Sequence, residues 1–164
     1  MTAIANRIRQ IPNGNAEHMT ERITQWPLAD YPATTSEKLR YGDTDRQGHI
    51  NNAVFATLFE SGRVDFLCNP QVPLAPSDTQ FVIAEITIKF LGELTWPGDV
   101  TIGTGVSRVG NASFSLVQAI FAADRCMATA QSAIVLIDEQ TRRSTPLPQA
   151  TRDALAALHM HPGA

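Results

Sequence analysis

The order of the predicted elements indicates an α+β fold, in which one long helix lies against a curled antiparallel sheet. An extended stretch at 36–41 comes first, a long helix follows, and four strands joined by short turns occupy the chain from Phe81 to Ile137. A single helix of about five turns is too narrow to cover an open sheet of five strands. The sheet is therefore expected to curl around the helix.

The composition is that of an ordinary globular protein with one domain. The chain has 164 residues, of which 43% are hydrophobic and 18% charged, so it can bury a sizeable core. The formal net charge of −3 predicts neither a nucleic acid nor a membrane surface as partner. No apolar run reaches the length of a membrane span, and no secretory signal is recognisable. We expect a cytoplasmic protein with an irregular leader at 1–30 and one folded domain at 31–164.

The helix is predicted from one apolar face and from the residues at its two ends. Asn51 or Asn52 is the natural N-cap, the helix should end before Pro70, and Glu60 with Arg63 forms a charge pair three residues apart. The apolar face recurs with helical spacing at Phe55, Leu58, Phe59, Gly62 and Phe66.

The strands are predicted from alternation and from turn residues. Strand residues alternate from Ala84 to Phe90, and turns follow at Trp96–Asp99, Gly110–Asn111 and Ala122–Arg125. The strand starting at Ser113 is apolar on both faces, so the sheet should be covered on both sides, by the helix and by a second subunit. The remaining elements are strands at Val100–Arg108, Ser113–Ala123 and Met127–Ile137, and a short helix at Ala150–Leu158.

A carboxylate a few residues ahead of the helix is the main candidate for chemistry. Asp45 precedes the pair Asn51 and Asn52, and Gly48 between them can take a positive φ. A helix N-terminus offers unpaired backbone N–H groups and the positive end of the helix dipole. A carboxylate facing such donors suits attack on a carbonyl, because the donors hold the oxyanion that forms.

The stretch from Arg40 to Asn52, followed by Phe55, Glu60 and Arg63, resembles the signature of hot-dog acyl-CoA thioesterases of the 4-hydroxybenzoyl-CoA thioesterase type. The resemblance continues through Pro97–Asp99, Gly110–Phe114 and Pro146–Pro148, and spans roughly residues 34–158. It implies a hot-dog fold, a homodimer or dimer of dimers with the site between two subunits, and hydrolysis of acyl-CoA. It also implies no metal and no organic cofactor, with CoA entering only as part of the substrate.

The resemblance assigns roles to individual residues. Asp45, in its Asp-x-x-Gly stretch, is the nucleophile or the general base, and the backbone N–H near Asn52 polarises the thioester carbonyl. His49 either shapes this loop or contacts the substrate. Asn51 and Asn52 are most simply caps, and one of them also touches the thioester or holds the attacking water. Glu60 is by default a solvated or ion-paired side chain and is the second choice for the role of Asp45.

Other residues have a structural and a functional interpretation side by side. Phe55 and Phe59, with Phe66, are either core or the lining of an acyl tunnel. Ser113 either begins a strand or lines the pocket of a facing subunit. The positive charges are either solvated or bind the phosphates of CoA, and the candidates are Arg108, Arg125, Arg142 and Arg143.

Three other functions stay open or are excluded. A thioesterase for acyl carrier protein and a non-catalytic acyl-CoA binder fit the same residues, whereas a hydratase would need an acid–base pair that the sequence lacks. The Asp43-x-Asp45 pattern is not a calcium loop, since Val54 stands where such a loop needs glutamate. No metal site is predicted, and Cys68 and Cys126 are expected as reduced, buried thiols.

Overall fold

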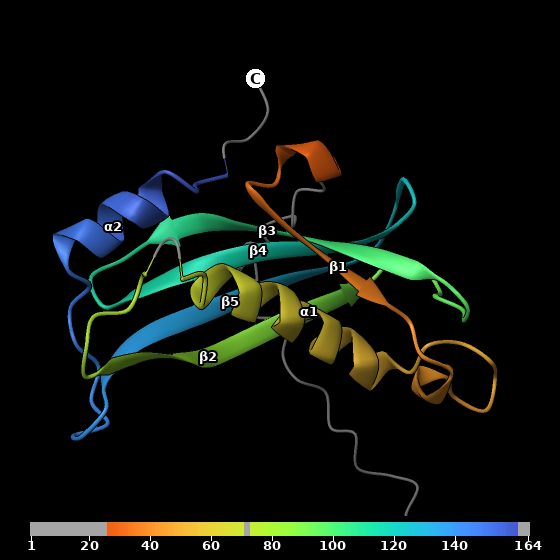
Figure 1. Cartoon of the computed structure of the whole chain (residues 1–164), viewed down its shortest axis with the longest axis horizontal. Helices are drawn as coiled ribbons and strands as arrows, with labels where there is room; N and C mark the ends of the chain where they lie inside the picture. The colour runs from red at the N-terminus through yellow and green to blue at the C-terminus, as the bar shows by residue number, and fades with distance from the viewer. Residues whose placement is uncertain (1–25, 71–72, 161–164) are drawn as a thin grey trace, which may run out of the picture.

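The computed structural model describes residues 26–70 and 73–160, through which one antiparallel sheet runs (Figure 1). Its spatial order is β1-β3-β4-β5-β2, so β1 and β2 are the two edge strands. All four pairings are antiparallel, as the sequence predicts. The strands are β1 (Ala33–Lys38), β2 (Thr79–Phe90), β3 (Asp99–Val109), β4 (Ser113–Ala122) and β5 (Arg125–Asp138).

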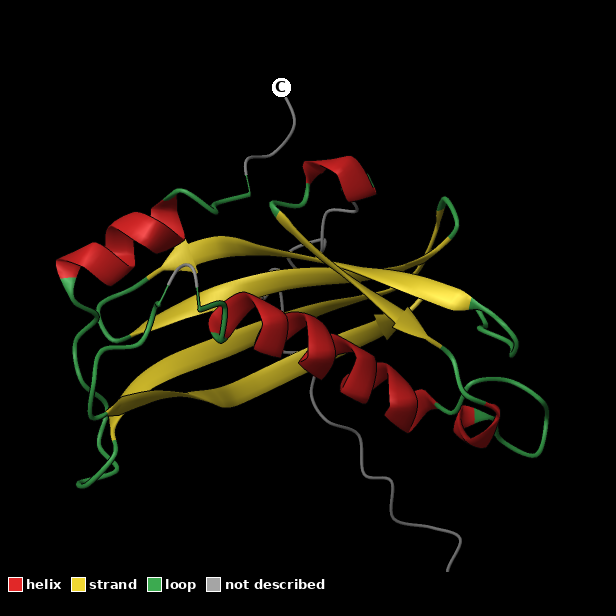
Figure 2. Cartoon of the chain, viewed as in Figure 1, coloured by secondary structure: helices red, strands yellow, loops and turns green. Residues whose placement is uncertain are grey.

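The long helix α1 (Asn52–Leu67) lies across one face of this sheet (Figure 2). Asn51 caps it, because its side-chain oxygen accepts a hydrogen bond from the N–H of Ala53 at 2.9 Å. The helix ends at Leu67, before Pro70 as predicted. Its buried residues are the predicted apolar face: Phe55, Leu58, Phe59, Gly62 and Phe66. The fold is therefore the hot-dog arrangement that the sequence predicts.

Gly62 is the point at which α1 comes closest to the sheet. A methyl group added there would lie 2.7 Å from the Cγ2 atom of Ile102 and 3.1 Å from polar atoms of Gln118 and Thr104. No space remains for a side chain, so glycine is required by packing, although it lowers helix propensity.

One patch on the outer face of the sheet is covered by Tyr31 and Met160 of the same chain. The ring of Tyr31 lies where a side chain on Gly103 would be, and Met160 lies in the same way over Gly105. Together with Val117, Ala119 and Phe121, these two side chains form a separate buried cluster. The prediction that a second subunit covers this face of β4 is therefore wrong for this patch.

A β-bulge in β2 changes which of its side chains point toward the same face of the sheet. The register with β5 shifts between Ile83 and Glu85, so Phe81 and Ile83 before the bulge share a face with Ile86, Ile88 and Phe90 after it. This face is on the side of α1, and Phe55 of the helix contacts Phe90 with ring centroids 5.2 Å apart, but most of the helix packs against β1, β3 and β4. Ile83, Ile86 and Phe90 therefore stay 48%, 37% and 48% exposed.

The remaining elements are short. The helix α2 (Gln149–Ala156) lies near the end of β3 and buries Thr151 and Leu155. The extended stretch predicted at 36–41 is displaced, because β1 ends at Lys38 and Tyr41–Asp43 forms a single 3₁₀ turn. A second 3₁₀ turn, Leu28–Asp30, follows Pro27. Most of the predicted leader, residues 1–25, lies outside the described residues, so the predicted domain boundary stays a prediction.

Two further findings concern the thiols and the helices. Both cysteines are free, but Cys68 is exposed at the C-terminal end of α1 and Cys126 is partly buried. The prediction that both thiols are buried is wrong, because Cys68 follows the last helical turn instead of facing the sheet.

Within residues 26–70 and 73–160, neither helix has the length and apolar character needed to cross a membrane.

We predict that Gly62→Ala destabilises the protein. Alanine would gain about 1 kcal/mol of helix propensity, whereas overpacking a close-packed core costs roughly 1–3 kcal/mol. The expected result is a net loss of about 1 kcal/mol in unfolding free energy, measured by urea denaturation. The control Thr57→Ala, at an exposed site on the same helix, should change stability by less than about 0.5 kcal/mol. A Gly62→Ala variant as stable as the parent would contradict the close approach.

Candidate active site

The segment before α1 folds back on itself as a small closed loop. Thr44 and Ile50 form an antiparallel bridge, and the N–H of Asp45 donates to the carbonyl oxygen of His49 at 2.8 Å. The N–H of Gly48 donates to the carbonyl oxygen of Asp45 at 3.1 Å, and Gly48 has a φ of 85°. The positive φ closes the loop and is the one predicted for this glycine.

The Asp45 carboxylate is half-buried and is held through one of its two oxygens. Its Oδ1 atom accepts hydrogen bonds from the N–H groups of Gln47, at 2.7 Å, and His49, at 3.2 Å. Within the described residues, Oδ2 accepts no hydrogen bond. The loop therefore orients the carboxylate and leaves one oxygen able to attack a carbon or to take a proton from water.

The start of α1 presents a backbone donor beside this loop. The side chain of Asn51 binds the N–H of Ala53, while the N–H of Asn51 donates to the carbonyl oxygen of Asp43 at 2.9 Å. Within the described residues, the N–H of Asn52 has no acceptor, as expected in the first turn of a helix. The structure thus separates the two asparagines: Asn51 is the cap, and Asn52 supplies the unpaired amide.

His49 connects the loop to the segment before β3. Its Nε2 atom lies 3.3 Å from the Oε2 atom of Glu93, and its backbone forms a bridge with Thr95. The N–H of Ile50 also donates to the carbonyl oxygen of Leu94 at 2.7 Å. These contacts give His49 a role in fixing the loop. Contact between His49 and a substrate stays a prediction.

Asp43 has a structural role, and its main partner is the side chain of Arg40. The Arg40 guanidinium donates to it at 2.8 and 3.1 Å, and the backbone N–H of Arg40 donates at 2.9 Å. The guanidinium hydrogen bonds lower the pKa of the Asp43 carboxyl below its ordinary value of 3.8. Asp43 therefore stays ionised and keeps the backbone in place where it accepts from Asn51.

The other predicted site residues do not all gather at this loop. Glu60 is exposed two turns further along α1, whereas Phe55 and Phe59 belong to the core, and Phe59 has no exposed surface. Neither phenylalanine lines the cavity between the second half of α1 and the start of β2. A contact of Phe55 or Phe59 with an acyl group stays a prediction.

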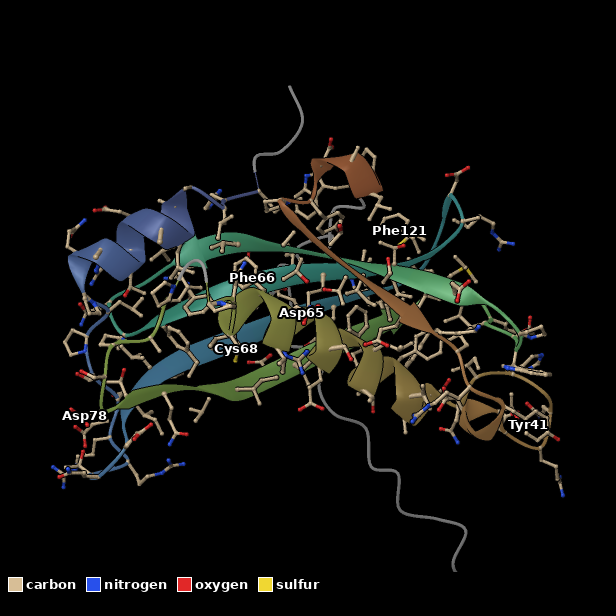
Figure 3. The ribbon with its side chains drawn as sticks, in the orientation of Figure 1. Tyr41, Asp65, Phe66, Cys68, Asp78 and Phe121 are labelled. Atoms are coloured by element: carbon tan, nitrogen blue, oxygen red, sulfur yellow. The ribbon has the colours of Figure 1, made fainter. Side chains whose placement is uncertain are left out.

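Arg108 and Ser113 lie at the opposite end of the sheet. Asp99, at the start of β3, pairs with Lys38 near the loop, whereas Val109, at the other end of β3, pairs with Phe114. Figure 3 shows the length of this separation, with Tyr41 at the loop end and Asp78 at the other. Within one chain, Arg108 and Ser113 cannot share a site with Asp45.

The other arginines named as phosphate ligands also divide between the two ends. Arg125 follows the β4–β5 turn at the loop end, and its Nη2 atom lies 3.7 Å from the position of a Cβ on Gly92. Arg142 and Arg143 follow β5 at the other end, and the carbonyl oxygen of Arg143 accepts from the N–H of Asp138. Arg125 is therefore the one of these arginines that lies at the loop end.

A buried polar group beneath α1 was missed by the sequence analysis. Gln118 is 1% exposed, and its Nε2 atom donates at 3.0 Å to the carbonyl oxygen of Phe59 and to the Oγ1 atom of Thr104. Its Oε1 atom accepts from the Nη1 atom of Arg63 at 3.3 Å. The sequence does contain one signal for this group, a glutamine at an inward position of an otherwise apolar strand. Its hydrogen-bond partners could not be predicted, because they are distant in the sequence.

Arg63 also differs from its prediction. The predicted pairing of Arg63 with Glu60 is present as an electrostatic effect of Glu60 on the pKa of Arg63, but the two side chains form no ion pair within 4 Å.

In the described residues, no group of three or more histidine, cysteine and acidic side chains is placed to hold a metal ion.

The antiparallel sheet, the single long helix and the loop at its N-terminus define a hot-dog protein. Residues 39–155, more than half of the chain, match the thioesterase-like superfamily. The chain therefore belongs to the thioesterase-like superfamily, which supports thioester hydrolysis as its general activity. No curated protein matches the sequence.

Solved structures support the same class. A predicted thioesterase from Bacillus stearothermophilus is 29% identical, with a TM-score of 0.72 over 79% of this chain and 98% of that chain. A thioesterase from Thermus thermophilus, in complex with coenzyme A and Zn, is 25% identical, with a TM-score of 0.70 over 81% and 98%. DHNA-CoA thioesterase from Staphylococcus aureus, 20% identical, shares the fold, with a TM-score of 0.66 over 77% and 91%. The 4-hydroxybenzoyl-CoA type stays a prediction.

We predict that Asp43→Asn lowers stability at neutral pH but not at acidic pH. Because its folded pKa is depressed, Asp43 contributes stability above pH 3.8, and this contribution is lost as the pH falls through the folded pKa. The difference in unfolding midpoint between the parent and the variant should therefore be large at pH 7 and small near pH 2. A difference that does not change with pH would mean that the Arg40 contact is not electrostatic.

Proposed function

We propose that this protein hydrolyses acyl-CoA thioesters, with Asp45 as the catalytic carboxylate and the N–H of Asn52 as the oxyanion donor. The observation that carries the proposal is that the loop holds Asp45 through Oδ1 alone, immediately before a capped helix start. The thioesterase-like superfamily and the neighbour solved with coenzyme A support it.

Two routes use the same groups. As a general base, Asp45 takes a proton from water while the water oxygen bonds to the thioester carbon, and the N–H of Asn52 binds the resulting oxyanion. The C–S bond then breaks, and the CoA thiolate leaves and is protonated. As a nucleophile, Asp45 first forms a mixed anhydride with the acyl group and releases CoA, and water then cleaves that anhydride. Neither route calls for a metal or an organic cofactor, so EDTA should leave the rate unchanged.

Two other functions would fit the same candidate site. An acyl carrier protein presents the same thioester on a phosphopantetheine arm, and comparing hydrolysis rates on the two donors separates these functions. A non-catalytic acyl-CoA binder would bind the ligand without releasing free CoA thiol.

We also propose that the protein is cytoplasmic. The cysteines Cys68 and Cys126 are free thiols, which suits a reducing compartment.

We further propose a homodimer that forms through the free edge of β2. This edge is twelve residues long and carries the exposed apolar side chains Ile83, Ile86 and Phe90, whereas β1 is short and polar. A two-fold axis at this edge reverses the second sheet, so the partner's β3–β4 hairpin would lie at the same end of the combined sheet as the Asp45 loop. Such a dimer would place Ser113 and Arg108 of one copy at the same end of the assembly as Asp45 of the other, and two dimers could then associate.

We predict that Asp45→Asn abolishes hydrolysis while the fold is retained. The amide cannot take the proton of water or form an anhydride, so kcat should fall by at least about 100-fold. The measurement is thiol release from a panel of short, medium, long and aromatic acyl-CoAs. The control Asp124→Asn, in the exposed β4–β5 turn, should keep the parental rate. An Asp45→Asn variant that turns over at the parental rate would remove Asp45 from the mechanism.

We predict that Ile86→Asp converts a dimeric protein into a monomer. The new charge would be placed on the apolar face of β2 beside the proposed interface, where burying it is unfavourable. Light scattering coupled to gel filtration measures the mass. The control Ser36→Asp puts the same charge on the opposite edge strand, where the site is also exposed, and should leave the mass unchanged. A monomeric parent, or a dimer that survives the Ile86 change, would refute this interface.

A further inference from the structure

A cavity of about 370 Å³ lies between the second half of α1 and the start of β2. Its walls are mostly apolar and come from both elements, with Val64 and Leu67 on the helix, Phe81 and Ile83 on β2, and Ile134 on β5. Glu60 and Arg63 bring the only charges in its lining. The size and the apolar lining are those of a small-molecule site.

Arg63 is a half-buried cation that uses little of its hydrogen-bonding capacity. Within the described residues, its guanidinium makes one hydrogen bond, from Nη1 to the Oε1 atom of Gln118. A guanidinium has five N–H donors, so most of them are left for solvent or a ligand. Burial lowers the pKa of Arg63, and the charge of Glu60 opposes this effect, so the side chain stays protonated.

Gln118 is arranged to hold this guanidinium in place. Both of its amide hydrogens are used, by the carbonyl oxygen of Phe59 and by Thr104, which directs its oxygen toward Arg63. A fully buried amide costs free energy unless it is satisfied in this way. The arrangement fixes a positive charge at the side of an apolar cavity instead of leaving it in open solvent.

We propose that this cavity binds the far end of the acyl group and that Arg63 selects acyl chains ending in a carboxylate. An apolar chain packs against the cavity walls formed by the helix and β2, and its terminal carboxylate accepts two parallel hydrogen bonds from the Arg63 guanidinium. Glu60 is exposed and screened by solvent, and it lies beyond ion-pair distance from Arg63. This inference rests on the proposed function, since it names the acyl group of that reaction.

The length of the helix limits the chain length. Arg63 follows Asn52 by eleven residues, which is roughly 16 Å along the helix axis, and side chains lean toward the N-terminus. A short dicarboxylic chain such as succinyl would not reach from the proposed oxyanion donor to the guanidinium. A medium chain such as octanedioyl is of the appropriate size.

The test compares octanedioyl-CoA with octanoyl-CoA, which differ only in the terminal group. For the parent we expect a higher kcat/KM on octanedioyl-CoA, by roughly ten- to one-hundred-fold, the range of a charge-assisted pair. Arg63→Met should remove this preference mainly through KM, while octanoyl-CoA is still hydrolysed. Arg63→Lys, which keeps the charge but not the fork, should restore part of it.

A binding measurement keeps this test independent of catalysis. Calorimetric titration with free octanedioate and octanoate should show tighter binding of the dicarboxylate to the parent, and equal binding to Arg63→Met. If the parent hydrolyses no acyl-CoA, the proposed function fails, and this titration still decides what the cavity binds. If the parent hydrolyses both thioesters equally, or if Arg63→Met keeps the preference, the inference is wrong and the proposed function stands.

Discussion

The close approach of α1 to the sheet is the constraint on which the rest of the structure depends. At Gly62 the helix backbone meets the side chains of Ile102, Thr104 and Gln118, and no other residue would fit without displacing them. Gln118 adds a directed contact, because its amide donates to the carbonyl oxygen of Phe59 on the helix. Packing and hydrogen bonding at one point therefore fix the depth and rotation of the whole helix.

A helix held in this way carries its N-terminus to a defined place. The loop from Thr44 to Ile50 closes on itself and is tied to the helix cap through the backbone of Asp43. Asp45 is consequently oriented by backbone donors, and it precedes Asn52, with its unpaired amide, by seven residues in the chain. Preorganised donors of this kind need no rearrangement when charge develops on a carbonyl oxygen, which is the physical basis of the acyl transfer proposed for this loop.

The same position of the helix leaves β2 only partly covered. Because α1 packs mainly over β1, β3 and β4 and reaches β2 through the contact of Phe55 with Phe90, the inner apolar face of β2 stays partly exposed at Ile83, Ile86 and Phe90. Two proposals arise from this one imbalance, the cavity beside Arg63 and the pairing of β2 with a second copy. They are compatible, because strands added at the edge of a sheet extend it sideways and leave the space between the helix and the sheet open.

Local patterns determined much of the fold and the core of the candidate site. Helical spacing identified the buried face of α1, and Asp45, Gly48 and the two asparagines were recognisable because capping and turn preferences act over a few residues. The bulge in β2, the cover that Tyr31 provides for the outer face, and the link from Gln118 to Arg63 depend on tertiary structure. Each joins groups far apart in the chain, and their contact depends on how strands register and how closely backbones approach, which no local pattern encodes.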